Sequence, residues 1–98
     1  MVKHVVMWKV KETQKKADDI QKLKEALESL PHKIKEIVEL EVGVDFSKKP
    51  ELSADIVLIT SFNSSDDLQV YQEHPAHLEV VKIVRSLTTE RRLVDYNI

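Results

Sequence analysis

The sequence predicts an α+β fold in which strands and helices follow one another in the order β-α-β-β-α-β. Hydrophobic residues alternate along four segments, which is typical of strands, and recur every three or four residues in two others, which is typical of amphipathic helices. The 98 residues are enough for one hydrophobic core and too few for two. We therefore expect residues 1–98 to form a single domain.

The first strand is predicted over residues 2–10. His4 and Trp8 share one face of this strand with three valines, whereas Val5 and Met7 lie on the opposite face. The first strand therefore carries apolar side chains on both of its faces.

The first helix is predicted over residues 13–30. Ile20, Leu23 and Leu27 recur at three- and four-residue steps, and most of the residues between them are charged or polar. Pro31 should end this helix, because a proline pushes the residue before it out of the helical conformation.

Two further strands are predicted over residues 36–46 and 54–62. Apolar side chains from Val38 to Phe46 share one face of the earlier strand, and the later strand is apolar on both faces. Gly43 lies inside a strand, which predicts either a bulge or a close approach of another backbone segment.

The second helix is predicted to begin at Ser64, and Asp67 follows three residues later in a variant of the capping box. Pro75 should interrupt this helix and begin another, because the first position of a helix does not need the N–H that proline lacks. A final strand is predicted over residues 89–97.

This order of elements is typical of the ferredoxin-like fold, a four-stranded antiparallel sheet with both helices on one face. The first and third strands are central in that fold, and here both are apolar on both faces. Helices can cover only one face, so the open sheet face should bind a partner.

Two partners are considered for this face, single-stranded RNA and a second copy of the chain. Binding RNA would require stacking aromatic residues and basic flanks, whereas the chain has five aromatics (one Trp, two Tyr, two Phe) and a net charge of −2. We therefore expect a homodimer formed through the open sheet face.

Composition also excludes several classes of function. The acidic net charge is unsuited to nucleic acid or to an anionic membrane surface, and no apolar run approaches the roughly 20 residues of a membrane helix. The absence of cysteine excludes disulfides, thiolate zinc sites and cysteine nucleophiles. The N-terminus lacks the small-residue cleavage site of a secretory signal, so we expect a cytoplasmic protein.

The segment from Tyr71 to His77 gathers groups that can move a proton near neutral pH. Tyr71 should share the buried face of its helix with Leu68, and His77 should point inward near a helix N-terminus, which disfavours imidazolium and suits a general base. A core tyrosine and a structural histidine explain the same pattern. His74 and His77 have a spacing that would suit a metal on a regular helix, but Pro75 breaks that geometry. We therefore expect no metal site, and a helix-capping role for His74.

The chain resembles the stress-responsive A/B barrel (Dabb) family in four segments, which are Met1-Val-Lys-His4-Val-Val, Glu41-Val-Gly43-Val-Asp-Phe-Ser, Ala54 to Phe62, and Tyr71-Gln-Glu-His74-Pro75-Ala-His77. The resemblance implies a dimeric α+β barrel without a cofactor. One plant member is a cofactor-free polyketide cyclase that closes a ring by an intramolecular aldol reaction. In that cyclase a tyrosine and a histidine matching Tyr71 and His77 carry the chemistry, and a histidine matching His4 lines the pocket.

The same resemblance implies a mostly apolar pocket, because a further pocket histidine of the cyclase corresponds to Ile56 here. The expected ligand-binding residues are His4, Trp8, Ile56, Leu58, Tyr71 and His77. The leading interpretation is a small-molecule-binding or stress-associated protein whose ligand is apolar or contains a carbonyl group.

The alternative interpretation is a cofactor-independent enzyme of the cyclase or isomerase type. In it His77 would be the general base, Tyr71 the acid or oxyanion donor, and His4 the orienting residue. A purely structural dimer without a pocket is a third interpretation. Arg85, Arg91 and Arg92 are expected to form salt bridges, with an anion-binding rim as the alternative.

Overall fold

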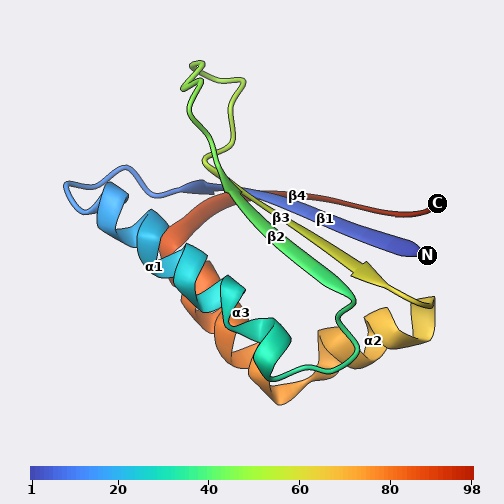
Figure 1. The fold of residues 1–98 in the computed structure, drawn as a ribbon. Helices are drawn as coiled ribbons and strands as arrows, with labels where there is room; N and C mark the ends of the chain where they lie inside the picture. Colours follow the sequence, from blue (N-terminus) through green and yellow to red (C-terminus); the bar gives the residue numbers. More distant parts are fainter.

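The computed structural model describes residues 1–98 as two layers, with the helices packed against one face of a single antiparallel sheet (Figure 1). The elements in chain order are β1 (Val2–Val10), α1 (Lys16–Glu28), the short 3-10 helix η1 (Leu30–His32), β2 (Glu39–Val44), β3 (Ile56–Phe62), α2 (Ser65–Glu73), α3 (Pro75–Leu87) and β4 (Thr88–Asn97). None of the helices is both long enough and apolar enough to cross a bilayer.

The strands lie in the order β2-β3-β1-β4, and every neighbouring pair is antiparallel. This order confirms the predicted ferredoxin-like sheet, with β1 and β3 at its centre. The register pairs His4 of β1 with Thr60 of β3 on one side and with Asp95 of β4 on the other. His4 therefore lies in the middle of the sheet, and Asp95 is its direct neighbour.

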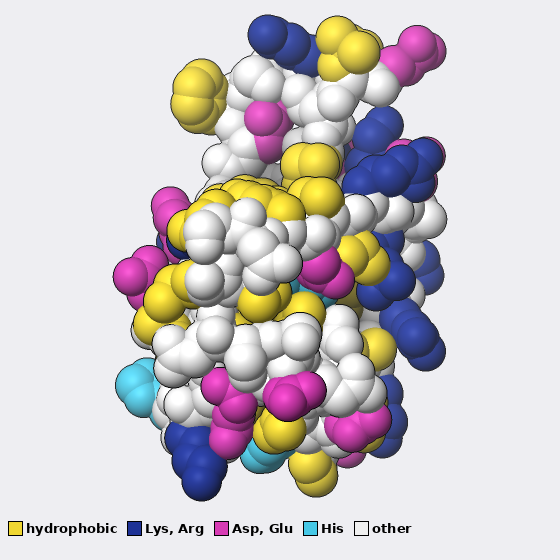
Figure 2. All heavy atoms as spheres, turned by 90° about the vertical axis from the view of Figure 1, so that its right-hand side faces the viewer, with side chains coloured by type: hydrophobic (Ala, Val, Ile, Leu, Met, Phe, Trp, Pro, Cys, Tyr) yellow, Lys and Arg dark blue, Asp and Glu magenta, His cyan; other side chains and the backbone are white.

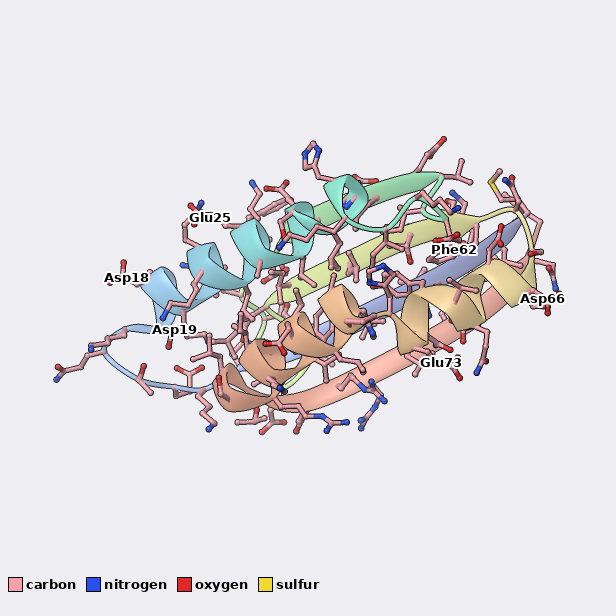
Figure 3. All side chains as sticks on the ribbon, turned by 90° about the horizontal axis from the view of Figure 1, so that it is seen from below. Asp18, Asp19, Glu25, Phe62, Asp66 and Glu73 are labelled. Atoms are coloured by element: carbon pink, nitrogen blue, oxygen red, sulfur yellow. The ribbon has the colours of Figure 1, made fainter.

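The hydrophobic core lies between the sheet and the helices. His4 and Trp8 are buried on the helix side of β1, whereas Met7 is 43% exposed on the opposite side, as the alternating pattern predicts. Seen from below, α1 runs beside α2 and α3 across the sheet, and Asp18 and Asp19 lie near the start of α1 (Figure 3). Phe62 is completely buried.

The second strand is shorter than predicted. It ends at Val44, because the Asp45 carboxylate accepts hydrogen bonds from the Ser47 hydroxyl and the Lys48 backbone N–H, both at 2.8 Å, and so closes a turn. Phe46 therefore lies in the loop and not on a strand face. Gly43 pairs with Val57 in regular register, without the predicted bulge, and a Cβ at Gly43 would lie 3.0 Å from a Val57 methyl carbon, so a side chain and not the backbone approaches it.

The open sheet face is apolar at its centre. It carries the side chains that alternate with the buried ones, namely Val5, Met7, Val57, Ile59, Val94 and Tyr96. The loop between β2 and β3 extends away from the helices (Figure 1), and hydrophobic side chains are visible at that end of the molecule (Figure 2). Phe46 and Leu52 in this loop are 94% and 82% exposed. The molecule thus presents apolar surface on the side of the sheet that the helices leave uncovered.

The Ser64 cap should contribute measurably to stability. The Ser64 hydroxyl accepts a hydrogen bond from the Asp67 backbone N–H at 3.1 Å, as predicted. Replacing such a cap by alanine leaves that N–H without its partner, so Ser64→Ala should lower the free energy of unfolding by about 1 kcal/mol. Urea denaturation measures this change. Ser65→Ala is the matched control, and an equal loss in both variants would contradict the capping role.

A pocket between the sheet and the third helix

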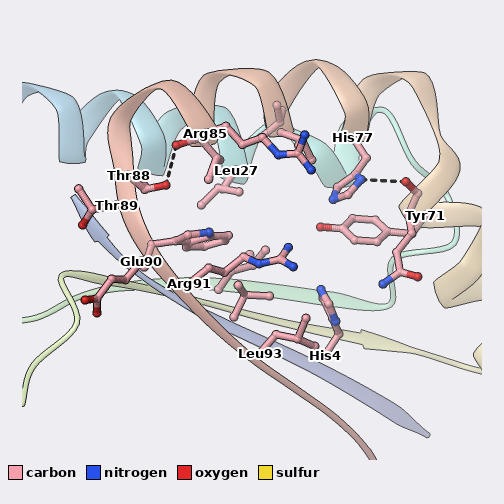
Figure 4. Close-up of a pocket in the computed structure, with 17 residues that line it drawn as sticks. His4, Leu27, Tyr71, His77, Arg85, Thr88, Thr89, Glu90, Arg91 and Leu93 are labelled. Atoms are coloured by element: carbon pink, nitrogen blue, oxygen red, sulfur yellow. Dashed lines mark hydrogen bonds between the residues drawn. The ribbon is translucent and has the colours of Figure 1, made fainter. Parts of the chain in front are cut away.

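A pocket of about 440 Å³ opens between the inner face of the sheet and α3 (Figure 4). This volume falls within the range of small-molecule sites in proteins. His4, Trp8, Leu58, Tyr71 and His77 all line the pocket, so five of the six residues predicted to bind a ligand lie together.

The remaining predicted residue, Ile56, does not line the pocket. It is the β3 partner of Trp8 and is only 1% exposed, because neighbouring core side chains cover it. Nine of the 17 lining residues are hydrophobic, so apolar residues form a small majority of the pocket wall. Gln72, Arg85 and Arg91 are polar lining residues that the predicted ligand-binding set lacked.

Tyr71 places a free hydroxyl group in the pocket. Its ring is 1% exposed and packs against Phe62 and His77 at centroid distances of 5.0 and 4.4 Å. No protein group hydrogen-bonds the hydroxyl, and no fully buried side-chain polar atom lacks a partner, so the Tyr71 oxygen must reach the open space of the pocket. Burial raises the pKa of Tyr71 far above its usual value, so the phenol stays protonated and acts as a donor.

His77 is held in one tautomer. Its Nδ1 lies 3.1 Å from the Gln72 carbonyl oxygen, and because a carbonyl only accepts, Nδ1 carries the proton and donates it. The neutral ring therefore keeps an unprotonated Nε2. Burial lowers the pKa of His77 and outweighs the Gln72 hydrogen bond, which raises it, so His77 is neutral at pH 7.

The break between α2 and α3 brings Tyr71 and His77 together. His74 has an extended backbone, ends α2, and accepts the Ala76 backbone N–H on its Nδ1 at 3.0 Å. Pro75 then begins α3 without needing a donor, as predicted. This capped break turns the chain so that residues from two successive helices meet ring to ring.

His4 is paired with a carboxylate. It is 6% exposed, its Nδ1 hydrogen-bonds Asp95 Oδ1, and its ring lies 6.1 Å from that of Tyr71. The carboxylate accepts, so Nδ1 donates and Nε2 is the remaining nitrogen for a ligand. Asp95 was missed because the register of β4 against β1, which makes the two residues neighbours, cannot be read from the sequence.

Comparison with known proteins shows the family of this chain. The model of the Dabb family, described as the Stress responsive A/B Barrel Domain, matches residues 2–98. The chain belongs to the Dabb family. No curated protein matched this Dabb sequence in a similarity search.

Solved structures share the fold of this chain. A dimeric protein of unknown function with a ferredoxin-like fold, from Bacteroides fragilis, is 34% identical with a TM-score of 0.87, and the match covers 99% of this chain and 95% of that one. A dimeric ferredoxin-like protein of unknown function from Thermobifida fusca is 22% identical (TM-score 0.86; 99% and 90% covered). A hydroxynitrile lyase from Passiflora edulis is 20% identical (TM-score 0.84; 99% and 92% covered).

The arginines of this Dabb chain correct a further expectation. The ion pairs are His4–Asp95, Lys16 with Glu12 and Asp55, and Lys82–Glu79. Neither Arg85, Arg91 nor Arg92 lies within 4.0 Å of a carboxylate, so the predicted salt bridges are absent. Nowhere do three His, Asp or Glu side chains gather as a metal-ligand set would.

His77 should make stability depend on pH in one defined window. An unfolded histidine binds its proton with a pKa of about 6.5, whereas burial lowers the pKa of His77 in the folded protein. Between these two values the unfolded chain binds a proton that the folded chain does not. The stabilisation by neutral His77 is therefore complete above pH 6.5 and is lost as pH falls toward the folded pKa.

Urea denaturation between pH 5 and pH 8 measures this effect. His77→Asn should remove part of the loss of stability below pH 6.5 that the wild type shows, because asparagine does not titrate. His32→Asn, at an exposed position, is the control and should keep the wild-type slope. An unchanged slope in His77→Asn would contradict the shifted pKa.

Proposed function

We propose that this Dabb protein binds a small carbonyl-containing molecule in the pocket between the sheet and α3. The observation that carries the proposal is the Tyr71 hydroxyl, a protonated donor that faces the pocket without a protein partner. A donor without a protein partner on the wall of a pocket can hydrogen-bond an acceptor of the ligand, and a carbonyl oxygen is a suitable acceptor. The unprotonated Nε2 of His77 would accept a hydrogen bond from a donor group of the same ligand.

Trp8 provides the test, because it is the single tryptophan of the chain and lines the pocket. We expect some members of a panel of aromatic and aliphatic ketones and aldehydes to change its fluorescence saturably. Tyr71→Phe should weaken the binding of those compounds about tenfold. It should change the free energy of unfolding by less than about 0.5 kcal/mol, since the hydroxyl bonds no protein group.

Tyr96→Phe is the matched control, because Tyr96 is the other tyrosine and its register places it on the open sheet face. It should leave the ligand affinity unchanged. If no compound of the panel changes Trp8 fluorescence, or if Tyr71→Phe binds as tightly as the wild type, the binding proposal is wrong.

A second function is favoured by the state of His77, and we propose it as an extension of ligand binding. A neutral imidazole whose Nε2 is free lies 4.4 Å, ring to ring, from a phenol that stays protonated. In this proposal His77 removes a proton from the carbon next to a bound carbonyl group. The Tyr71 hydroxyl stabilises the enolate oxygen that forms, and His4, held by Asp95, orients the ligand. The hydroxynitrile lyase of the same fold supports an enzymatic use of this architecture.

The assembly we propose is a homodimer through the open sheet face. The relatives from Bacteroides fragilis and Thermobifida fusca are described as dimeric, and the centre of this face is apolar and uncovered in the single chain. Phe46 and Leu52, in the loop that extends away from the helices, would lie beside the partner's sheet and bury their exposed side chains there.

A further inference from the structure

We infer that Arg85 and Arg91 form a subsite for an oxyanion, so that the ligand of this pocket carries a carboxylate or phosphate group in addition to its carbonyl group. This inference rests on the proposed binding function and narrows the class of ligand. Both arginines line the pocket, one from α3 and the other from β4.

The connection between α3 and β4 holds the two arginines on opposite walls. Arg85 lies in the last turn of α3, and β4 begins at Thr88 directly after that helix ends. Arg91 is paired in register with Trp8, whose side chain is buried on the helix side of the sheet. Figure 4 shows both guanidinium groups reaching into the pocket, toward the end where Tyr71 and His77 lie.

No protein carboxylate neutralises these two charges. Neither Arg85 nor Arg91 takes part in any of the ion pairs. Glu90 is the one acidic residue in the pocket lining, and its carboxylate points away from both guanidinium groups (Figure 4). The chain as a whole has a net charge of −2, so a general excess of basic residues does not explain this pair of positive charges.

Two guanidinium groups on facing walls match the chemistry of an oxyanion. Each offers planar, parallel N–H donors that bind carboxylate or phosphate oxygens two at a time. Partial enclosure by apolar side chains such as Val84 and Leu93 lowers the local dielectric constant and strengthens that attraction. A ligand held there by its anionic group would present its carbonyl group to the Tyr71 hydroxyl.

The test compares 4-oxo-4-phenylbutanoate with its uncharged methyl ester, using Trp8 fluorescence and the whole protein. The wild type should bind the acid about tenfold more tightly than the ester. Added salt should lower the affinity for the acid and leave the affinity for the ester unchanged. Arg85→Met and Arg91→Met should each remove most of this preference while the ester still binds. Inorganic phosphate should compete with the acid but not with the ester.

Lys82→Met is the matched control, because it removes one positive charge from α3 at an exposed residue outside the pocket lining. It should keep the wild-type preference for the acid. Equal binding of acid and ester by the wild type would overturn the oxyanion subsite and leave the binding function standing. The inference would also be overturned by a preference that survives in both arginine variants, provided that circular dichroism shows them folded. If neither compound binds the wild type, both proposals fail for this class of ligand.

Discussion

His77→Asn should slow the exchange of α-hydrogens of a bound ketone with deuterated solvent by about a hundred- to ten-thousand-fold. The proposed base is the Nε2 of His77, and an asparagine amide cannot take up a proton at neutral pH. The substitution is conservative in packing, because the asparagine amide can still donate a hydrogen bond toward the Gln72 carbonyl that now accepts from Nδ1. Proton NMR of a ketone in D2O, chosen as one that changes Trp8 fluorescence, measures the exchange rate.

Binding must be measured on the same samples to separate catalysis from ligand binding. If His77→Asn binds the ketone with an affinity within a few-fold of the wild type but no longer accelerates its hydrogen exchange, the result supports catalysis. His32→Asn should exchange at the wild-type rate, because His32 is exposed outside the pocket. If the wild type binds the ketone without accelerating its exchange, the catalytic proposal is wrong and ligand binding alone remains.

The second large effect concerns assembly, where Met7→Lys should convert the proposed dimer to a monomer. Met7 lies on the open face of the central strand β1 and is 43% exposed in the single chain, so the monomer can accept lysine there. In a sheet-to-sheet dimer the charge would be buried without a partner, which costs several kcal/mol. Light scattering coupled to size exclusion at micromolar concentration measures the change in mass.

Leu78→Lys is the matched control for assembly. Leu78 is 48% exposed, much like Met7, but it lies on α3 in the helix layer. We expect this variant to remain dimeric. A monomeric wild type, or a Met7→Lys variant that stays dimeric, would contradict an interface on the open sheet face.

The fold was predictable because its signals are local. The alternation along β1, the cap at Ser64 and the proline that begins α3 each depend on their own segment of chain, and all three agree with the structure. The end of β2 was less predictable, since the alternation continues to Phe46 while the hydrogen bonds of Asp45 have already closed a turn.

The site was only partly predictable, because it depends on which segments meet. Tyr71 and His77 were identified because helix phase and the capped break at Pro75 determine their direction. Asp95 and Arg91 lie on β4, and only the register of that strand against β1 brings them to His4 and Trp8. The family resemblance aligned Ile56 with a pocket residue of the cyclase. An alignment gives the position of a residue along the chain but does not show how deeply its side chain is buried, and Ile56 is covered by the core.

The central claim is that Tyr71, His77 and His4 line a working ligand site, and NMR of the histidine rings tests it most directly. The chain has four histidines, of which His4 and His77 line the pocket whereas His32 and His74 do not. We expect the ring signals of His4 and His77 to shift together, with one shared affinity, as a ketone that changes Trp8 fluorescence is added, while His32 stays unchanged. Saturable binding that leaves the signals of both pocket histidines unchanged would contradict the account.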